Sequence, residues 1–219
     1  NDSEGINKIK DEIKRPITTY GLSSDADIYA NNLSFDKMNS AYSLNYKNEN
    51  IGKVNLNAPG KHNILNSLAA IAIGFELGLN KQTIIEGINS YQGVRRRFEI
   101  KGEVDDIIVI DDYAHHPTEV LATIETASVS WDRRIVAIFQ PHLYSRTKEF
   151  YKDFAKALIK SDVTIITDIY PAREKPIEGI TGQLVYQELK KNGHANVIYE
   201  PNLEKLTHLV DGIVKQNDL

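Results

Sequence analysis

The sequence predicts an α/β protein whose second half forms a parallel β-sheet with flanking helices. After residue 94, short apolar runs alternate with segments of helical periodicity, a pattern typical of parallel strands joined by helical crossovers. Before that point, residues 41–90 read as a β-hairpin followed by two helices. We therefore expect two parts with different architecture, residues 1–94 and residues 95–219.

The composition is that of an ordinary globular protein, with 219 residues of which 41% are hydrophobic and 26% charged. The net charge of −4 gives no reason to expect nucleic acid as a partner. The absence of cysteine excludes disulfides and thiolate chemistry. The N-terminus lacks an apolar signal core, and no run approaches the roughly 18 apolar residues of a membrane span. We predict a cytoplasmic protein with no membrane partner, and the sequence indicates no oligomeric state.

Two features concern the ends of the chain. It does not begin with methionine, and it stops at Asn217-Asp218-Leu219, where a new apolar run could begin. We interpret the sequence as a fragment of a longer protein.

In the first part, residues 41–46 and 51–56 alternate around a polar turn, which predicts the hairpin. Pro59-Gly60 then precedes apolar residues at helical spacing, namely Ile64, Leu68, Ile71, Ala72, Phe75 and Leu79. This helix is expected to stop at Gly78 or Asn80, and a second helix to cover residues 81–90.

In the second part, strands are predicted at residues 107–110, 134–139, 163–167 and 197–199. Helices are predicted at residues 117–128, 147–159, 181–191 and 202–214. Polar residues follow three of the strands, as Asp111–His116, Gln140–His142 and Asp168. Because the carboxyl ends of parallel strands share one edge, we expect these three groups to lie together, where α/β proteins bind ligands.

The crowded stretch DDYAHHPTE, residues 111–119, has three interpretations. Asp112 or His116 caps the helix that begins at the proline, with Glu119 favourable in its first turn. Alternatively, Asp112, His115 and Glu119 bind a metal ion, although these are few distinctive ligands. In the third interpretation, Asp112 accepts hydrogen bonds from ribose hydroxyls and the histidines lie beside an anion.

The segment PGKHNILN places His62, Asn63 and Asn66 at the start of a helix. The two asparagines are three residues apart and share a face, and their carboxamides offer the donor and acceptor that an adenine edge requires. The helix N-terminus also favours phosphate. The alternative is a helix cap beside a surface asparagine.

Two further segments carry charged or polar side chains. The run Arg95-Arg96-Arg97 is either a solvated basic run or a source of a guanidinium for a transferring phosphoryl group. In QPHLYSRT, residues 140–147, the side chains suited to bind a small carboxylate are His142, Tyr144, Ser145 and Arg146, with Arg146 as a bidentate donor. The alternative is that Ser145 or Thr147 caps the following helix.

Four motifs together resemble the Mur ligases, the ATP-dependent ligases that build the peptide of peptidoglycan. They are APGKHNILNSLAAIA at 58–72, GVRRRFE at 93–99, DDYAHHPTEV at 111–120 and FQPHLYSRT at 139–147. The resemblance implies that residues 1–94 are the latter portion of the central ATP-binding domain and residues 95–219 most of a C-terminal Rossmann-like domain. The family's GKT phosphate loop and its Glu and His magnesium ligands would lie upstream, so this chain alone is expected to be inactive.

FQPHLYSRT resembles the family members that join L-alanine to the carboxylate of UDP-N-acetylmuramate through an acyl phosphate. The resemblance implies ATP and Mg²⁺ as cofactors, and UDP-N-acetylmuramate and L-alanine as substrates. By that resemblance, His62, Asn63 and Asn66 hold adenine, Arg97 reaches the γ-phosphate and acts in catalysis, Asp112 binds ribose, and Tyr113, His115, His142 and Arg146 position alanine and the muramoyl group. Some members have a basic residue where this chain has Leu143, so the carboxylate would depend more on Arg146.

Three alternative functions stay open from the sequence. One is a recycling ligase that joins a whole murein tripeptide to the same muramate substrate. Another is a non-catalytic nucleotide-binding module with this fold. A metal-dependent hydrolase that uses Asp112 and His115 is a more remote third.

Overall fold

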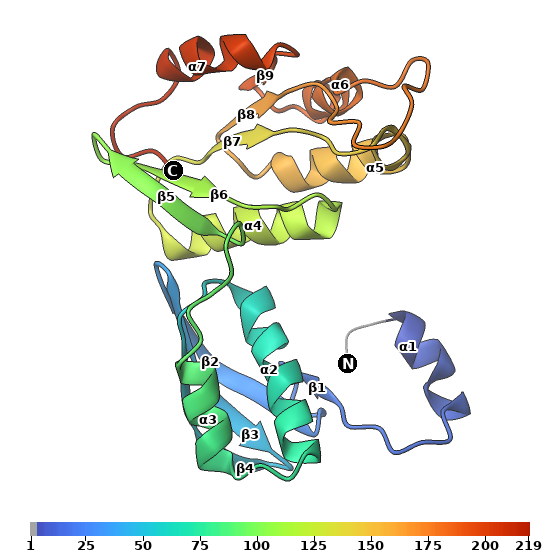
Figure 1. The fold of residues 1–219 in the computed structure, drawn as a ribbon, viewed down its shortest axis with the longest axis vertical. Helices are drawn as coiled ribbons and strands as arrows, with labels where there is room; N and C mark the ends of the chain where they lie inside the picture. The colour runs from blue at the N-terminus through green and yellow to red at the C-terminus, as the bar shows by residue number, and fades with distance from the viewer. Residues whose placement is uncertain (1–3) are drawn as a thin grey trace. The chain divides into compact units, whose positions relative to one another are not determined.

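A computed structural model describes residues 4–219, and the chain divides into two compact units, Asn1–Gly93 and Val94–Leu219 (Figure 1). Within the described residues, no helix has the length and apolar character needed to cross a membrane.

Unit 1 is a four-stranded sheet in the order β1-β2-β3-β4 with helices packed on it. Its strands are β1 (Tyr20–Gly21), β2 (Ile28–Asp36), β3 (Asn39–Tyr46) and β4 (Glu49–Leu56). Its helices are α1 (Glu4–Ile9), the 3-10 turn η1 (Lys10–Glu12), α2 (Lys61–Glu76) and α3 (Lys81–Asn89). The β3–β4 hairpin and both helices α2 and α3 confirm the predicted elements.

Helix α2 buries the predicted apolar face against the sheet, with Ile64, Leu68 and Ile71 fully buried. It ends where Gly78 takes a left-handed φ of 75°, which a glycine adopts without steric cost. Asn80 does not stop α2 but caps α3, because its side chain accepts a hydrogen bond from the amide of Thr83.

The remaining strands of unit 1 were not predicted, because their sequence pattern is broken. β2 carries a register shift between Asn31 and Ser34, and Asn32 has a positive φ of 51°. A bulge of this kind interrupts the alternation that marks a strand. β1 is a two-residue strand paired in parallel with β2, too short to give a pattern.

Unit 2 contains a parallel sheet in the order β7-β8-β9 and a separate antiparallel pair, β5-β6. The strands are β5 (Glu99–Val104), β6 (Ile107–Asp111), β7 (Val136–Phe139), β8 (Val163–Ile166) and β9 (Val197–Tyr199). The helices are α4 (Pro117–Ser130), α5 (Tyr144–Leu158), α6 (Gln183–Lys191) and α7 (Leu203–Asp211). The α/β class with a parallel sheet and flanking helices is thereby confirmed.

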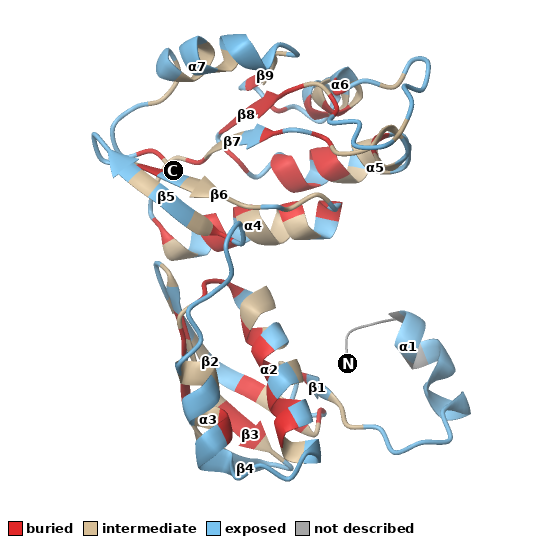
Figure 2. Cartoon of the chain, viewed as in Figure 1, coloured by how far each residue is buried: buried red, intermediate tan, exposed pale blue. Residues whose placement is uncertain are grey.

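The core of unit 2 joins the sheet to the row of helices α4, α5 and α6 (Figure 2). Phe154 and Leu158 of α5 meet Phe139 of β7 and Ile166 of β8. All four residues of β8 are buried, as expected for a central parallel strand.

One prediction for unit 2 was wrong. The strand at 107–110 does not pair with β7 in the parallel sheet; β6 pairs instead with β5, antiparallel. β5 escaped prediction because its residues are half-exposed or exposed and Gly102 lies at a register shift.

Candidate nucleotide and carboxylate site

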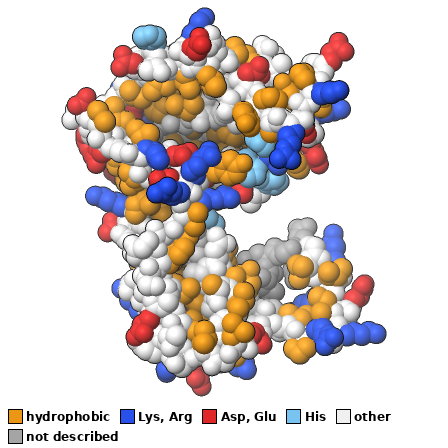
Figure 3. Space-filling view, viewed as in Figure 1, with side chains coloured by type: hydrophobic (Ala, Val, Ile, Leu, Met, Phe, Trp, Pro, Cys, Tyr) orange, Lys and Arg blue, Asp and Glu red, His pale blue; other side chains and the backbone are white. Residues whose placement is uncertain are grey.

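The polar segments that follow β6, β7 and β8 lie at one edge of unit 2, as predicted. The ring of His115 lies 5.8 Å from that of His142, which in turn stacks on Tyr170 at 5.6 Å. Gln140 donates from its side chain to the carbonyl of Asp168 at 3.4 Å. Figure 3 shows histidine and basic side chains gathered on this unit.

Asp112 organises the segment after β6. Its Oδ2 accepts hydrogen bonds from the Phe98 amide at 3.1 Å and the Thr123 hydroxyl at 3.0 Å. Its Oδ1 accepts from the Ala114 amide at 2.9 Å. Burial raises the pKa of this carboxyl and outweighs these donors and the nearby Arg97, which favour the charged form. Asp112 therefore fixes the backbone that presents its neighbours, and it does not cap α4.

His116 is the cap of α4, which confirms one interpretation of the DDYAHHPTE stretch. Its Nδ1 accepts from the Thr118 amide at 3.4 Å, and Glu119 completes a capping box. Oε2 of Glu119 accepts from the amides of His115 at 3.0 Å and His116 at 3.1 Å. Burial opposes ionisation of Glu119, but these amides, together with His115 and Arg97, lower its pKa overall.

Two arginines of the basic run, Arg96 and Arg97, contact this segment. The Arg96 guanidinium lies over the ring of Tyr113 at 4.8 Å and 3.4 Å from the Asp111 carboxylate. Arg97 lies 3.6 Å from Oε1 of Glu119, and its side chain is half-exposed. The Arg97 guanidinium is therefore held at the strand end and still reaches solvent.

Arg146 joins the first and second strand-end segments. Its Nη1 donates to the His115 carbonyl at 3.3 Å and contacts Nδ1 of His142 at 3.2 Å. Burial lowers the pKa of His142, and the charges of Arg146 and His115 lower it further. Tyr113 completes the group, with its ring 4.9 Å from that of His115. The structure thus brings together the four residues assigned to the alanine and muramoyl substrates.

The first turn of α5 is held by Glu174, a residue that no sequence motif indicated. Leu143, the residue before the helix, has a left-handed φ of 71° and provides no side-chain cap. The Ser145 amide donates to Glu174 at 2.9 Å, and the Ser145 hydroxyl also donates to that carboxylate. The hydroxyl of Thr147 donates back to the Leu143 carbonyl. Neither Ser145 nor Thr147 is the cap, so the alternative interpretation of QPHLYSRT was wrong.

Tyr170 and Glu174, both from the segment after β8, were missed because they stand apart from any motif. The backbones of His142 and Tyr170 form a parallel bridge, and the Tyr170 carbonyl accepts from the Leu143 amide at 3.0 Å. Nearby, Asp168 accepts from the Gly182 amide at 3.1 Å. No local spacing in the sequence links residues 140–146 with 168–182, so the sequence alone could not predict these contacts.

In unit 1, the start of α2 carries the three residues assigned to adenine. Gly60 precedes the helix with a φ of 90° and provides no side-chain cap. The Asn63 carboxamide donates to the Pro59 carbonyl at 2.8 Å, which leaves its oxygen to act as an acceptor. His62 and Asn63 are partly buried and Asn66 is exposed. The three lie within two turns of one helix end.

The interpretation of Asp112, His115 and Glu119 as metal ligands was wrong, because the three side chains do not converge on one point. Across residues 4–219, no three His, Asp or Glu side chains are grouped so that they could hold a metal ion. Asp112 is directed to Phe98, Ala114 and Thr123, whereas Glu119 is directed to the helix start.

Both units match one class of protein. A family model described as "Mur ligase, glutamate ligase domain" matches residues 96–219, and one described as "Mur ligase middle domain" matches residues 1–74. The chain belongs to the Mur ligase family, and the resemblance drawn from its motifs is confirmed.

Within that family, the chain is similar to proteins named UDP-N-acetylmuramate–L-alanine ligase. It is 42% identical over 218 residues to that of Geotalea daltonii, covering 100% of this chain and 48% of the relative. It is 40% identical to that of Salinibacter ruber, covering 100% of this chain and 46% of the relative. The chain thus spans about half the length of the curated relatives it matches.

Solved structures agree with this placement. The UDP-N-acetylmuramate–alanine ligase of Thermotoga maritima superposes with a TM-score of 0.75 at 28% identity, covering 92% of this chain and 43% of that one. A murein peptide ligase from Psychrobacter arcticus has a TM-score of 0.60 at 23% identity, covering 91% of this chain and 41% of that one, and shows the same fold.

Proposed function

We propose that this chain is the latter portion of a cytoplasmic ATP-dependent ligase that joins L-alanine to the carboxylate of UDP-N-acetylmuramate in peptidoglycan precursor synthesis. The observation that carries the proposal is the contact of Arg146 with His142 and with the His115 carbonyl at the strand edge. The names of the relatives, at 39–44% identity over the whole chain, support the choice of substrates.

In this proposal, residues 1–94 are the end of the ATP-binding domain and residues 95–219 most of the C-terminal domain. Neither part contains the GKT loop, and the Glu and His ligands for Mg²⁺ are expected outside these residues. We therefore expect the isolated chain not to catalyse ligation.

ATP would supply a leaving group, because a carboxylate is a poor electrophile until one of its oxygens is phosphorylated. The donors present are suited to that nucleotide. Asn63 and Asn66, with His62, offer amide and imidazole groups to an adenine edge. Asp112 offers further lone pairs to ribose hydroxyls, and the half-exposed Arg97 offers a guanidinium to a phosphoryl group.

The acceptor side uses Tyr113, His115, His142 and Arg146. Arg146 carries a fixed positive charge, and its planar guanidinium suits a carboxylate such as that of L-alanine. Burial and the charge of Arg146 lower the pKa of His142, which favours its neutral form beside the guanidinium. The alanine amine then attacks the activated carbonyl, phosphate leaves, and the new amide bond retains the alanine nitrogen.

The test uses a protein of the relatives' full length that contains these 219 residues. Phosphate release is measured with ATP, Mg²⁺ and UDP-N-acetylmuramate, and L-alanine is compared with the L-Ala-D-Glu-diaminopimelate tripeptide. Release that depends on L-alanine supports the proposal. Release only with the tripeptide identifies the recycling ligase, and no release with either acceptor contradicts the proposed ligase activity and leaves the fold unchanged.

A further inference from the structure

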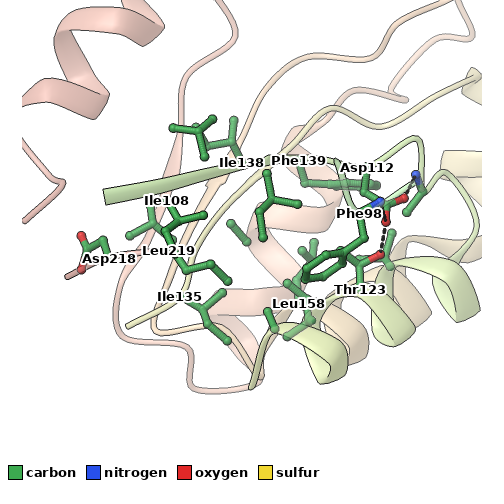
Figure 4. A pocket seen from close by; sticks show the side chains of 18 of the residues that line it. Phe98, Ile108, Asp112, Thr123, Ile135, Ile138, Phe139, Leu158, Asp218 and Leu219 are labelled. Carbon is green, nitrogen blue, oxygen red and sulfur yellow. Dashed lines mark hydrogen bonds between the residues drawn. The ribbon is translucent and has the colours of Figure 1, made fainter. Parts of the chain in front are cut away.

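The segment that follows β6 is held by a carboxylate of its own. Figure 4 shows Asp112 with the hydrogen bond that it accepts from the Thr123 hydroxyl at 3.0 Å, beside the cavity between β6 and β7. The segment that follows β7, residues 140–147, contains neither aspartate nor glutamate. The placement of its His142 and Arg146 therefore depends on contacts from other parts of unit 2.

The backbone of this second segment is unfavourable at Leu143. Its φ of 71° lies in the left-handed region, which a residue with a bulky side chain occupies only where the surrounding contacts impose it. Leu143 lies between His142 and the first turn of α5, where Nη1 of Arg146 lies 3.2 Å from Nδ1 of His142. That contact therefore depends on how the left-handed residue is held.

Tyr170, in the segment that follows β8, holds the backbone on both sides of His142. Its carbonyl accepts from the Leu143 amide at 3.0 Å, and its own amide donates to the Pro141 carbonyl at 2.8 Å. Its ring stacks on the imidazole of His142, with the ring centroids 5.6 Å apart. These contacts fix His142, whereas the first amides of α5 have no partner within the helix itself.

Glu174 supplies a partner for these amides. A turn closed by the hydrogen bond from the Glu174 amide to the Pro171 carbonyl, at 2.9 Å, precedes its side chain. The carboxylate accepts from the Ser145 amide at 2.9 Å and from the Ser145 hydroxyl. These two donors are the largest causes that lower the pKa of Glu174, the Tyr144 amide and the charge of Arg146 lower it further, and burial opposes the shift. An ionised carboxylate therefore holds Ser145, the residue next to Arg146.

We propose that Glu174 is a positioning residue of the acceptor site. Its carboxylate fixes Ser145 and thereby directs the adjacent Arg146 toward His142, in the place where the guanidinium meets the carboxylate of L-alanine. The inference rests on the proposed function, because it takes Arg146 as the group that binds this carboxylate. Glu174 acts through Arg146, so its loss should weaken the binding of the acceptor more than it slows turnover or weakens the use of ATP.

The experiment compares three variants with their parent in a protein of the relatives' full length. Glu174→Ala removes the carboxylate, and Glu174→Gln keeps one acceptor oxygen for Ser145 without the charge. Glu178→Ala is the matched control, because Glu178 is an exposed glutamate of the same segment. Steady-state phosphate release is measured against the concentrations of L-alanine and of ATP.

In Glu174→Ala we expect the KM for L-alanine to rise at least tenfold, while kcat and the KM for ATP change less than twofold. Glu174→Gln should give an intermediate rise, and Glu178→Ala should match the parent. A merely structural role would lower kcat or the amount of active protein instead. An unchanged KM for L-alanine in Glu174→Ala, an equal rise for both substrates, or a fall in kcat alone overturns the proposal.

A second measurement does not depend on catalysis. The ¹⁵N resonance of His142 Nδ1 reports whether this nitrogen accepts a hydrogen bond, and it is recorded above the ordinary histidine pKa. In Glu174→Ala it should move toward its position in Arg146→Gln, the reference for a lost contact. An unchanged resonance overturns the proposal.

The two measurements separate this inference from the proposed function. If the parent releases phosphate only with the tripeptide, the proposed acceptor is wrong, and the KM for the tripeptide then tests the role of Glu174. If the parent releases no phosphate with either acceptor, the resonance of His142 decides alone.

Discussion

The guanidinium of Arg146 donates to Nδ1 of His142 at 3.2 Å. Arginine has no acceptor, so the contact is a hydrogen bond only when Nδ1 of His142 carries no proton. Burial and the charges of Arg146 and His115 lower the pKa of His142 in the same sense. Both features favour a neutral imidazole beside a permanent positive charge, an arrangement suited to an anionic substrate.

Replacing that charge should change the titration of His142. In Arg146→Gln, the pKa of His142 should rise toward the ordinary histidine value but stay below it, since burial is the larger cause. Histidine NMR titration measures this, with His194 as the control, because burial, Asp162 and Lys190 shift its pKa and Arg146 is not among the causes. An unchanged titration curve of His142 would contradict the electrostatic effect of Arg146 on its pKa.

His142 also makes the free energy of unfolding of unit 2 depend on pH. The folded-state pKa of His142 lies below its unfolded value, so the unfolded chain binds more protons in the interval between the two. The free energy of unfolding should therefore fall as the pH drops from the ordinary histidine range toward the folded-state pKa. Denaturant titrations at several pH values test this, and His142→Asn should remove that part of the slope.

Asp112 should matter for stability independently of any nucleotide. Asp112→Asn keeps only one acceptor oxygen for three donors, and the net loss should be about 1–2 kcal/mol of unfolding free energy. Thr123→Val removes one donor and should cost less, since both oxygens still have partners. If Asp112→Asn leaves stability unchanged, the network does not hold the segment after β6.

Gly182 lies at a position where no side chain fits. A Cβ there would lie 2.1 Å from the Thr167 carbonyl oxygen and 3.3 Å from the Asp168 Cα, both backbone atoms. Gly182→Ala should destabilise unit 2 by about 3 kcal/mol, in the upper range of overpacking costs. Gly102→Ala is the matched control, because its Cβ would meet nothing within 4 Å. Equal stability of the two variants in denaturant would refute the close approach.

The ion pair between Arg134 and Asp218 in unit 2 is also sensitive to pH. The Arg134 guanidinium lowers the pKa of the Asp218 carboxyl, so its stabilisation is present above the ordinary aspartate value and is lost as pH falls through the folded-state pKa. Asp218→Asn should cost about 1–3 kcal/mol near neutral pH, typical of a charged hydrogen bond. The difference from the parent should shrink in acid, and a pH-independent difference would contradict the ionic contact.

Elements with a regular apolar pattern were predictable from the sequence, whereas contacts between distant segments were not. Ile64, Leu68 and Ile71 at helical spacing predicted α2, and the apolar runs predicted β7, β8 and β9. The pairing of β6 was not predictable, because whether two strands join depends on what lies between them. Glu174 and Tyr170 were missed for the same reason, since their contacts with Ser145 and His142 span 28 or 29 residues of chain.

The capping role of His116 shows a different limit. The histidines, aspartates and glutamate of DDYAHHPTE are compatible with a helix cap, a substrate site or, with few distinctive ligands, a metal site. The directions of the side chains in the structure show which of them hold the start of the helix. His116 and Glu119 point to the helix start, and Asp112 to three donors around its own segment.

The central claim is that the strand-edge group binds the carboxylate of L-alanine. The most direct test compares Arg146→Lys with its parent in a protein of the relatives' full length, using steady-state phosphate release. Lysine keeps the charge but loses the planar fork, so the KM for L-alanine should rise at least tenfold while the KM for ATP changes less than twofold. An unchanged KM for L-alanine, or an equal rise for both substrates, would contradict the claim.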